Sequence, residues 1–217
     1  MVTVYGSNNF QSEDLLAYEL GYRVQVTNTL STDVATFYNQ YSNLRTAEPG
    51  APFLEGNPVP TDLVVPFVAG NKMGGGTYGA EFIADWKVTP KWRLVGSYSY
   101  LQMDIAKNSN SLDPTADLPN GSNPRHQWYV RSSLDLPRHF DFDNTLRFVD
   151  HLAALNIPSY YSLDAHVGWR PVPRVQFSIT GQDLLNNQHL EFIPDFINTA
   201  PTIVKRAVYG SVTVNFK

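Results

Sequence analysis

Residues 206–216 read Arg-Ala-Val-Tyr-Gly-Ser-Val-Thr-Val-Asn-Phe, one residue short of the end of the printed chain. Every second position carries an apolar side chain or glycine: Val208, Gly210, Val212, Val214 and Phe216. Strict alternation of this kind indicates a β-strand with one apolar and one polar face. A closing strand that finishes on an aromatic residue is typical of outer-membrane β-barrels. Because strands of soluble β-sandwiches also alternate, the rest of the chain must decide between the two classes.

Seven further segments alternate in the same way, and no segment of useful length has a helical period. They are residues 14–26, 77–88, 92–100, 126–136, 141–149, 159–170 and 175–182. The segment 32–45 is expected to be a strand as well, although its alternation is less regular. Residues 63–88 are expected to form one long strand that bends at Gly74-Gly75-Gly76, because consecutive glycines mark bends and bulges. With the closing strand, the sequence predicts nine antiparallel strands.

The connections between these segments alternate between short and long along the whole chain. Short turns are predicted at 27–31, 89–91, 137–140 and 171–174, and long links at 46–60, 107–124, 150–158 and 186–205. Outer-membrane barrels have short periplasmic turns and long extracellular loops. A Greek-key sandwich has no reason to keep the two lengths on separate sides. The sequence therefore predicts an all-β fold, namely the wall of an antiparallel transmembrane barrel.

Composition excludes several classes of site. The 217 residues contain no cysteine, which rules out disulfides and thiolate metal sites. The net charge is −4 and the basic residues are scattered, so no nucleic-acid surface is expected. No run approaches the roughly 18 apolar residues of a membrane helix. Twelve Tyr, twelve Phe and four Trp are many for a chain without such a run, and a barrel wall accounts for both facts.

Two observations lead us to expect a piece of a longer protein. The first residues, Met-Val-Thr-Val-Tyr-Gly-Ser-Asn-Asn-Phe, lack the basic region and apolar core of an export signal. Nine strands is an odd number, whereas single-chain bacterial barrels have even numbers.

Several stretches resemble the TonB-dependent receptors, the active-transport barrels for siderophores, cobalamin and related nutrients. The stretches are Tyr18-Glu19-Leu20-Gly21-Tyr22-Arg23, similar to "YELGYK"; residues 37–44, Phe-Tyr-Asn-Gln-Tyr-Ser-Asn-Leu, similar to "FYNDYDNL"; Thr77-Tyr78-Gly79-Ala80-Glu81, similar to the "GVE" element; Gly181-Gln182-Asp183-Leu184-Leu185-Asn186, similar to "NLLD"; and the closing strand. Two departures are visible. Asp183 stands where the family usually has Asn, and Lys217 follows the aromatic Phe216 on which the family's chains normally end.

The resemblance implies that residues 1–217 are the C-terminal part of the 22-stranded receptor barrel, with the plug domain absent. It implies uptake of a scarce nutrient such as a siderophore or cobalamin, in the outer membrane of a Gram-negative bacterium, without enzymatic activity and without a cofactor. The partners that it implies are outer-membrane lipid, the missing plug domain and barrel strands of the same protein, TonB through the absent N-terminal part, and a small nutrient ligand.

Two alternatives remain open at this point. One is a small self-contained barrel of eight or ten strands that acts as a pore or a lipid enzyme. The other is a soluble, carbohydrate-binding β-sandwich, whose apolar faces would meet in a core.

Candidate site residues are identified by their position in the sequence and by their parity, that is, whether they fall on the apolar or the polar set of alternating positions. An aromatic girdle at the membrane surface is expected from Trp86, Trp92, Trp128, Trp169 and Phe216, which share the apolar parity. Ligand contacts are expected on the polar parity and on the loop after residue 186, from Arg131, Asp164, His166, Phe192 and Phe196.

Two other patterns on the polar parity are interpreted as structural. Ser162, Asp164 and His166 share one face, but same-face neighbours lie about 7 Å apart, too far for a catalytic triad within one strand. Charges of both signs recur on that parity and are expected to form cross-strand ion pairs. The spacing of the five histidines predicts no metal site.

Overall fold

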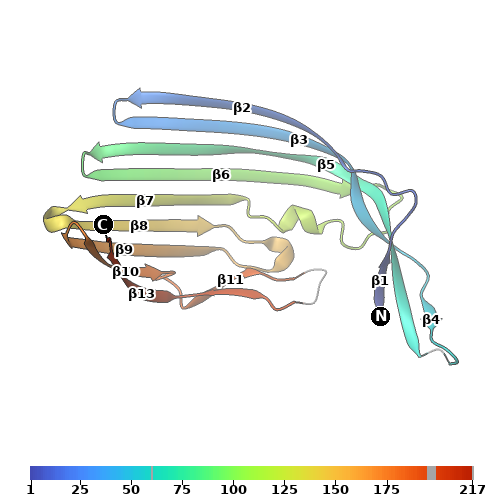
Figure 1. Cartoon of the computed structure of the whole chain (residues 1–217). Coiled ribbons are helices and arrows are strands. Elements are labelled where there is room, and N and C mark those ends of the chain that lie inside the picture. Colours follow the sequence, from blue (N-terminus) through green and yellow to red (C-terminus); the bar gives the residue numbers. More distant parts are fainter. Residues whose placement is uncertain (60, 195–198, 217) are drawn as a thin grey trace. The chain divides into compact units, whose positions relative to one another are not determined.

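A computed structural model describes residues 1–59, 61–194 and 199–216 (Figure 1). The chain divides into two compact units. Unit 1 comprises Met1–Glu19, Phe37–Tyr78 and Gln102–Gly121, and unit 2 comprises Leu20–Thr36, Gly79–Leu101 and Ser122–Lys217. Four long strands contribute residues to both units.

The strands of the described residues are β1 (Val2–Tyr5), β2 (Asp14–Thr27), β3 (Leu30–Pro49), β4 (Phe53–Glu55), β5 (Asp62–Thr89), β6 (Trp92–Lys107), β7 (His126–Leu136), β8 (Phe140–Val149), β9 (Tyr160–Val172), β10 (Val175–Gln182), β11 (Gln188–Phe192), β12 (Thr202–Lys205) and β13 (Ala207–Val214). Three 3₁₀ turns accompany them: η1 (Leu118–Gly121), η2 (Pro137–His139) and η3 (Ala153–Leu155). In the part of the chain that the structure describes, no helix has the length and apolar character needed to cross a bilayer.

Unit 2 is built on a sheet in which nine strands lie side by side in the order β13-β10-β9-β8-β7-β6-β5-β3-β2. The neighbouring strands from β6 to β10, and β10 with β13, pair antiparallel, which confirms the predicted arrangement. β7 and β10 have the predicted bounds, and β5 is the single long strand that the glycine run led us to expect.

The closing strand is shorter than predicted. It ends at Val214, which pairs with Val175 at the start of β10. Beyond this pair, the Asn215 N–H donates to the Arg174 carbonyl in the turn that precedes β10. Phe216 therefore lies beyond the strand, with 90% of its surface exposed.

In the described part of the chain, no second sheet covers the apolar face of the nine-stranded sheet of unit 2. Val130, Val167, Ile179 and Val212 lie on this apolar face and are 42–63% exposed. In a β-sandwich such side chains would be buried against a facing sheet. The arrangement therefore differs from the β-sandwich that the sequence left open as an alternative.

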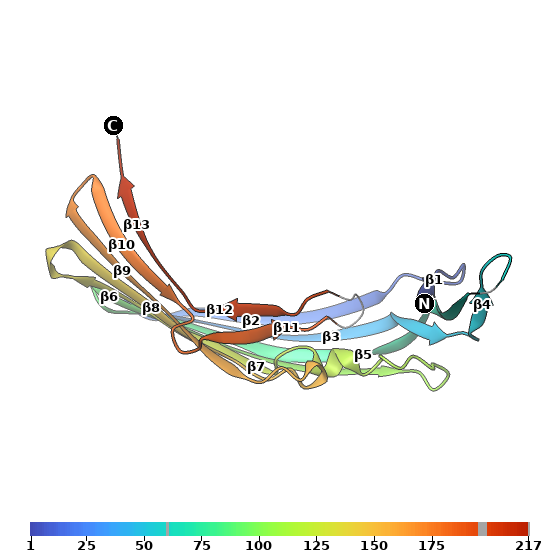
Figure 2. The same cartoon turned by 90° about the horizontal axis from the view of Figure 1, so that it is seen from below.

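The 186–205 region differs from its prediction as a loop without strand pattern. β11 and β12 pair with each other as a two-stranded sheet, shown in Figure 2, with Leu190 opposite Ile203. Leu190 and Phe192 thus belong to β11. These strands have only five and four residues, too few for a clear alternation, which explains why the sequence pattern missed them.

Unit 1 consists of the long-loop ends of β2, β3, β5 and β6 together with two short strands. β1 runs parallel to β5, with Val2 opposite Val65, and β4 runs antiparallel to it, with Phe53 opposite Val64. The region 46–60, predicted to be irregular, contains the end of β3 and all of β4. β5 exceeds the barrel strands in length and can accept these additional partners at its far end.

Gly75 allows β5 to pass close to β6 in unit 1. Its φ of +146° is one that side-chain-bearing residues rarely adopt, and a Cβ there would overlap the Asp104 carbonyl oxygen and lie 2.9 Å from the Ile105 Cα. We expect Gly75→Ala to lower the free energy of unfolding by about 1–3 kcal/mol. Guanidinium unfolding of the full-length protein in detergent measures this change.

Gly96→Ala on β6 is the matched control. A Cβ at Gly96 meets nothing nearer than the Tyr129 carbonyl oxygen at 3.9 Å, so the unfolding free energy should change by no more than about 0.5 kcal/mol. Equal unfolding midpoints for the two variants would contradict the close approach at Gly75.

Candidate membrane and ligand surfaces

A row of aromatic rings crosses the apolar face next to the short turns. Phe140, Trp169 and Phe177 come from β8, β9 and β10 and lie opposite one another in the register of the sheet. The Phe140 and Trp169 rings stack at 5.7 Å and 13°, and the Trp169 and Phe177 rings at 5.8 Å and 28°. We call these three residues the turn-side row.

A second row crosses the other ends of the same strands. Trp128, Phe148 and Tyr161 come from β7, β8 and β9 and are again aligned by the register. Their ring centroids are separated by 5.0–6.0 Å. We call them the loop-side row.

The distance between the rows has the scale of a bilayer. Phe140 and Phe148 are eight residues apart on β8, and Trp169 and Tyr161 are eight apart on β9. At about 3.4 Å per residue this separation is about 27 Å along the strand. The apolar band of a transmembrane barrel is about 25 Å tall and is bounded by aromatic residues on both sides.

The remaining residues predicted for the girdle differ from the two aromatic rows in their surroundings. Trp92 donates its indole N–H to the Ser132 hydroxyl at 3.0 Å, on the apolar face beside the β5–β6 turn. Trp86 lies near the same turn and is 45% exposed. Phe216 lies beyond β13 and is 90% exposed.

The opposite face of the sheet carries charges that pair across neighbouring strands. The Arg93 guanidinium binds both carboxylate oxygens of Asp85, at 2.8 and 2.5 Å. Further pairs are Arg23–Asp33, Arg131–Asp143 and Arg170–Asp141. Four strand pairs therefore carry an ion pair, which confirms the expected cross-strand pairing. All four include an Arg side chain more than half exposed, so each contributes little to stability.

The predicted ligand residues of the polar face are largely engaged within the wall. The Asp164 carboxylate accepts the backbone N–H of Asp183 at 2.9 Å, and His166 Nδ1 lies 2.8 Å from the Thr180 hydroxyl. Arg131 is the freer group, since its 3.8 Å pair with Asp143 leaves the side chain 55% exposed. Within residues 1–59, 61–194 and 199–216, no hydrogen bond joins Ser162 to His166, in line with the structural interpretation of that triplet.

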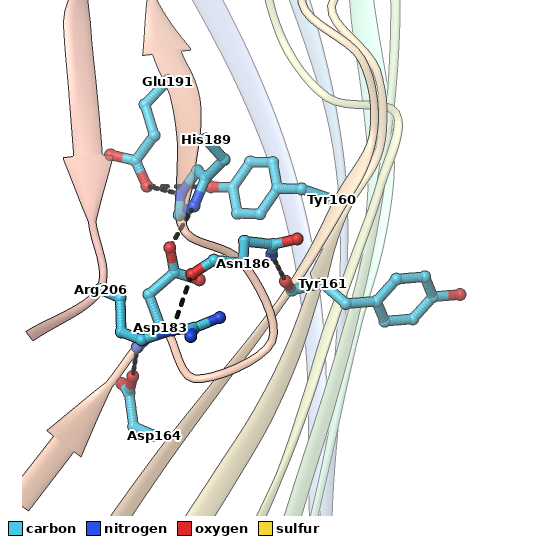
Figure 3. Close-up of polar contacts among 8 residues, drawn as sticks. All are labelled: Tyr160, Tyr161, Asp164, Asp183, Asn186, His189, Glu191 and Arg206. Atoms are coloured by element: carbon cyan, nitrogen blue, oxygen red, sulfur yellow. Dashed lines mark hydrogen bonds and ion pairs between the residues drawn. The ribbon is translucent and has the colours of Figure 1, made fainter.

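A polar cluster that the sequence did not predict fixes the chain after β10 (Figure 3). His189 Nδ1 lies 2.9 Å from an Asp183 oxygen, and His189 Nε2 lies 3.0 Å from Glu191 Oε1. The Tyr160 ring stacks on the imidazole at 4.0 Å, and its hydroxyl donates to Glu191. Both imidazole contacts are hydrogen bonds at once only when the ring carries two protons.

Asp183 is the centre of this cluster. Asp183 is 2% exposed, its φ is +51°, and its Oδ1 has no hydrogen-bond partner in the described part of the chain. The signal for this cluster in the sequence was that Asp183 stands where the resembled family usually has Asn. Its partner His189 lies six residues later, beyond the reach of a local motif.

The aromatic residues expected to touch ligand are only partly described. Phe192 is the last residue of β11 and is 46% exposed. Phe196 lies outside the described residues. For the described residues, no group of three or more His, Cys, Asp or Glu side chains is arranged to hold a metal ion.

In unit 1, two carboxylates hold the segment after β6 against β3. Glu48 accepts hydrogen bonds from the Ser111 hydroxyl at 2.7 Å and the Leu112 N–H at 2.9 Å, and pairs with Lys72 at 3.4 Å. Asp113 accepts the Ala47 N–H and both the N–H and the hydroxyl of Thr115, each at 2.7 Å.

These contacts set the protonation of both carboxyls. Burial acts to raise the pKa of Glu48, but the hydrogen bonds from Leu112 and Ser111 outweigh it and lower the pKa to about 2. Burial likewise acts to raise the pKa of Asp113, and the hydrogen bonds from Ala47 and Thr115 lower it on balance. The loop 107–124 is therefore pinned by two ionised groups.

We expect Glu48→Gln to release this segment. The lowered pKa means that the carboxylate stabilises the segment fully above pH 4.5, its ordinary pKa, and that this contribution is lost as the pH falls from 4.5 to about 2. The substitution should cost about 1–3 kcal/mol of local stability at pH 7, because it removes a charged acceptor of two hydrogen bonds. Hydrogen exchange of peptides covering 108–118 measures the loss.

Glu55→Gln, on the exposed strand β4, is the matched control and should leave exchange unchanged. Unaltered protection in Glu48→Gln, or protection in the unmodified protein that persists at pH 2 after correction for intrinsic exchange, would refute the role of Glu48.

Comparisons with known proteins identify relatives of this chain. A family model described as "TonB dependent receptor-like, beta-barrel" matches residues 1–184. The FrpB iron transporter of Neisseria meningitidis is similar over 98% of this chain and 33% of its own, with a TM-score of 0.71 and 13% identity. The siderophore receptor PirA of Acinetobacter baumannii is similar over 98% and 33%, with a TM-score of 0.69 and 15% identity.

The ferric yersiniabactin uptake receptor FyuA of Yersinia pestis is similar over 94% of this chain and 30% of its own, with a TM-score of 0.62 and 17% identity. At such identities these likenesses establish the fold, and the chain spans about a third of the length of each of these proteins. The family match covers most of the sequence. This chain belongs to the TonB-dependent receptor-like β-barrel family.

Proposed function

We propose that this chain is part of the wall of an outer-membrane receptor that takes up a scarce nutrient in a Gram-negative bacterium. The observation that carries the proposal is the pair of aromatic rows about 27 Å apart, with exposed apolar side chains between them on the same face. The ion-paired face behind them suits a water-filled, plug-containing interior. In this proposal Trp86, Trp92, Trp128 and Trp169 form the girdle, and Phe216 closes onto strands outside this chain.

The comparisons favour a metal or a metal chelate as the nutrient. The similar structures are named as an iron transporter, a siderophore receptor and a ferric yersiniabactin uptake receptor. We propose that residues 1–217 are the C-terminal part of such a barrel, with the plug domain and the other strands in the remainder of the complete protein. TonB would supply the energy through that remainder.

For ligand contact we propose Phe192 and Arg131 first, because each is about half exposed. Phe196 remains a candidate with them. Asp164 and His166 are weaker candidates, since both are engaged in hydrogen bonds within the wall. Within the described residues no clustered metal ligands occur, so a chelate held by aromatic and basic groups suits this wall better than a bare ion.

Uptake measurements on the complete protein test the proposal. Expressed in a Gram-negative host that lacks its own siderophore receptors, it should restore growth on at least one ferric siderophore, and an otherwise identical host without TonB should not grow. Arg131→Gln should raise the siderophore concentration that supports half-maximal growth, while Arg125→Gln, an exposed basic residue before β7, serves as control. Growth that is independent of TonB, at wild-type rate, would contradict active transport.

A further inference from the structure

A hollow on the apolar face of unit 2 lies directly beside the turn-side row. It has a volume of about 450 Å³ and is lined by Trp169, Phe177, Ile179, Val212 and neighbouring residues of β8, β9, β10 and β13. Gly210 stands opposite Ile179 in the register and adds no side chain to the hollow, whereas the next positions of β13 on the same face carry Val208 and Val212. The hollow opens on the face that the proposed function turns toward lipid. A hollow of this shape accepts a hydrocarbon chain.

A second hollow, of about 590 Å³, lies at the short turns and shares Phe140 with the first. Its lining includes Lys91, Arg138, His139 and Arg170. Asp135 also lines it, and Arg170 pairs with Asp141 at 3.2 Å. Among the described residues, the side chains of Lys91 and Arg138 form no hydrogen bond or ion pair, so two unpaired cations face this hollow.

The turn that carries Arg138 and His139 is built at a conformational cost. Both residues lie in the left-handed region, with φ of 62° and 63°. Glycine or asparagine adopts that region more readily than arginine or histidine. Because backbone strain of this kind is retained mostly where a side chain has a task, the pair of basic residues on this turn points to a ligand for them.

We propose that the two hollows together hold one anionic phospholipid. Its phosphate lies between Lys91 and Arg138, and one acyl chain passes Phe140 and fills the space above Gly210. Three observations favour a lipid over a soluble anion or a peptide. The cationic hollow and the apolar one share Phe140, the apolar one opens on the face that the proposed function turns toward lipid, and the turn-side row lies where that function places the headgroup level of the bilayer.

The inference rests on the proposed function, because it requires the apolar face to lie in a membrane. The inference goes beyond the proposed function because it assigns one lipid class to one position on the wall. Each of the two unpaired cations should contribute about fivefold in affinity for an anionic headgroup.

Native mass spectrometry of the complete protein in detergent tests the site. Dioleoyl phosphatidylglycerol should bind more tightly than dioleoyl phosphatidylcholine, which has the same chains and no net charge. Lys91→Gln and Arg138→Gln should each weaken phosphatidylglycerol binding about fivefold and leave phosphatidylcholine unchanged. Gly210→Leu should weaken binding of both lipids, because it fills the hollow for the chain.

Two matched variants control for general effects. Lys205→Gln removes an exposed cation from β12, and Val208→Leu enlarges an apolar side chain on β13 outside the hollow. Neither should alter lipid binding. If Gly210→Leu fails to fold, Gly210→Ala replaces it, since its Cβ would meet only the Ser178 carbonyl oxygen at an ordinary 3.5 Å.

Equal affinity for the two lipids, or equal loss in the control variants, would overturn the site as an ordinary annular contact. Displacement of phosphatidylglycerol by millimolar inorganic phosphate alone would also overturn it, as would occupation of the hollows by a second copy of the protein. A protein that restores siderophore growth but lacks headgroup preference refutes only the lipid site. A protein absent from the outer-membrane fraction refutes both the site and the proposed function.

Discussion

The ladder of backbone hydrogen bonds between neighbouring strands is the interaction on which the rest of this structure depends. In hydrocarbon no water can satisfy a backbone N–H or C=O, so a chain that crosses it as strands must pair each strand on both sides. Pairing in register forces side chains to alternate between two faces. The aromatic rows, the exposed valines and the arginine–carboxylate pairs of unit 2 all follow from that single register.

Departures from the ladder occur where something other than the bilayer sets the conformation. Gly75 lets β5 approach β6 where a side chain would not fit. Arg138 and His139 adopt a turn conformation that suits glycine better. After β10, Asp183 leaves the strand in a left-handed conformation and is held by His189. In unit 1, the Glu48 carboxylate fixes the segment after β6 through hydrogen bonds from Ser111 and Leu112.

The sequence was sufficient for features that repeat and insufficient for features that occur once. Alternation predicted the nine strands, the long strand β5 and the bounds of β7 and β10, because a buried or lipid-facing side must recur every second residue. It missed β1, β4, β11 and β12, which are five residues or fewer and have no face that demands a pattern. The contact of His189 with Asp183 and Glu191 was also beyond it, since a strand–loop contact leaves no periodic trace. Asp164 and His166 were correctly assigned to the polar face, but their hydrogen bonds depend on β10 and the residues after it.

Site-directed spin labelling along β9 tests the central claim most directly, because the chain itself contains no cysteine. Single labels at positions 161 to 169 of the complete protein in bilayers would be probed for collision with oxygen, which is enriched in lipid, and with a nickel chelate, which stays in water. We predict an oscillation with a period of two residues, in which Tyr161, Leu163, Ala165, Val167 and Trp169 are oxygen-accessible and the residues between them are not. Uniform accessibility, or an oscillation of the opposite phase, would contradict the assignment of the apolar face to the membrane.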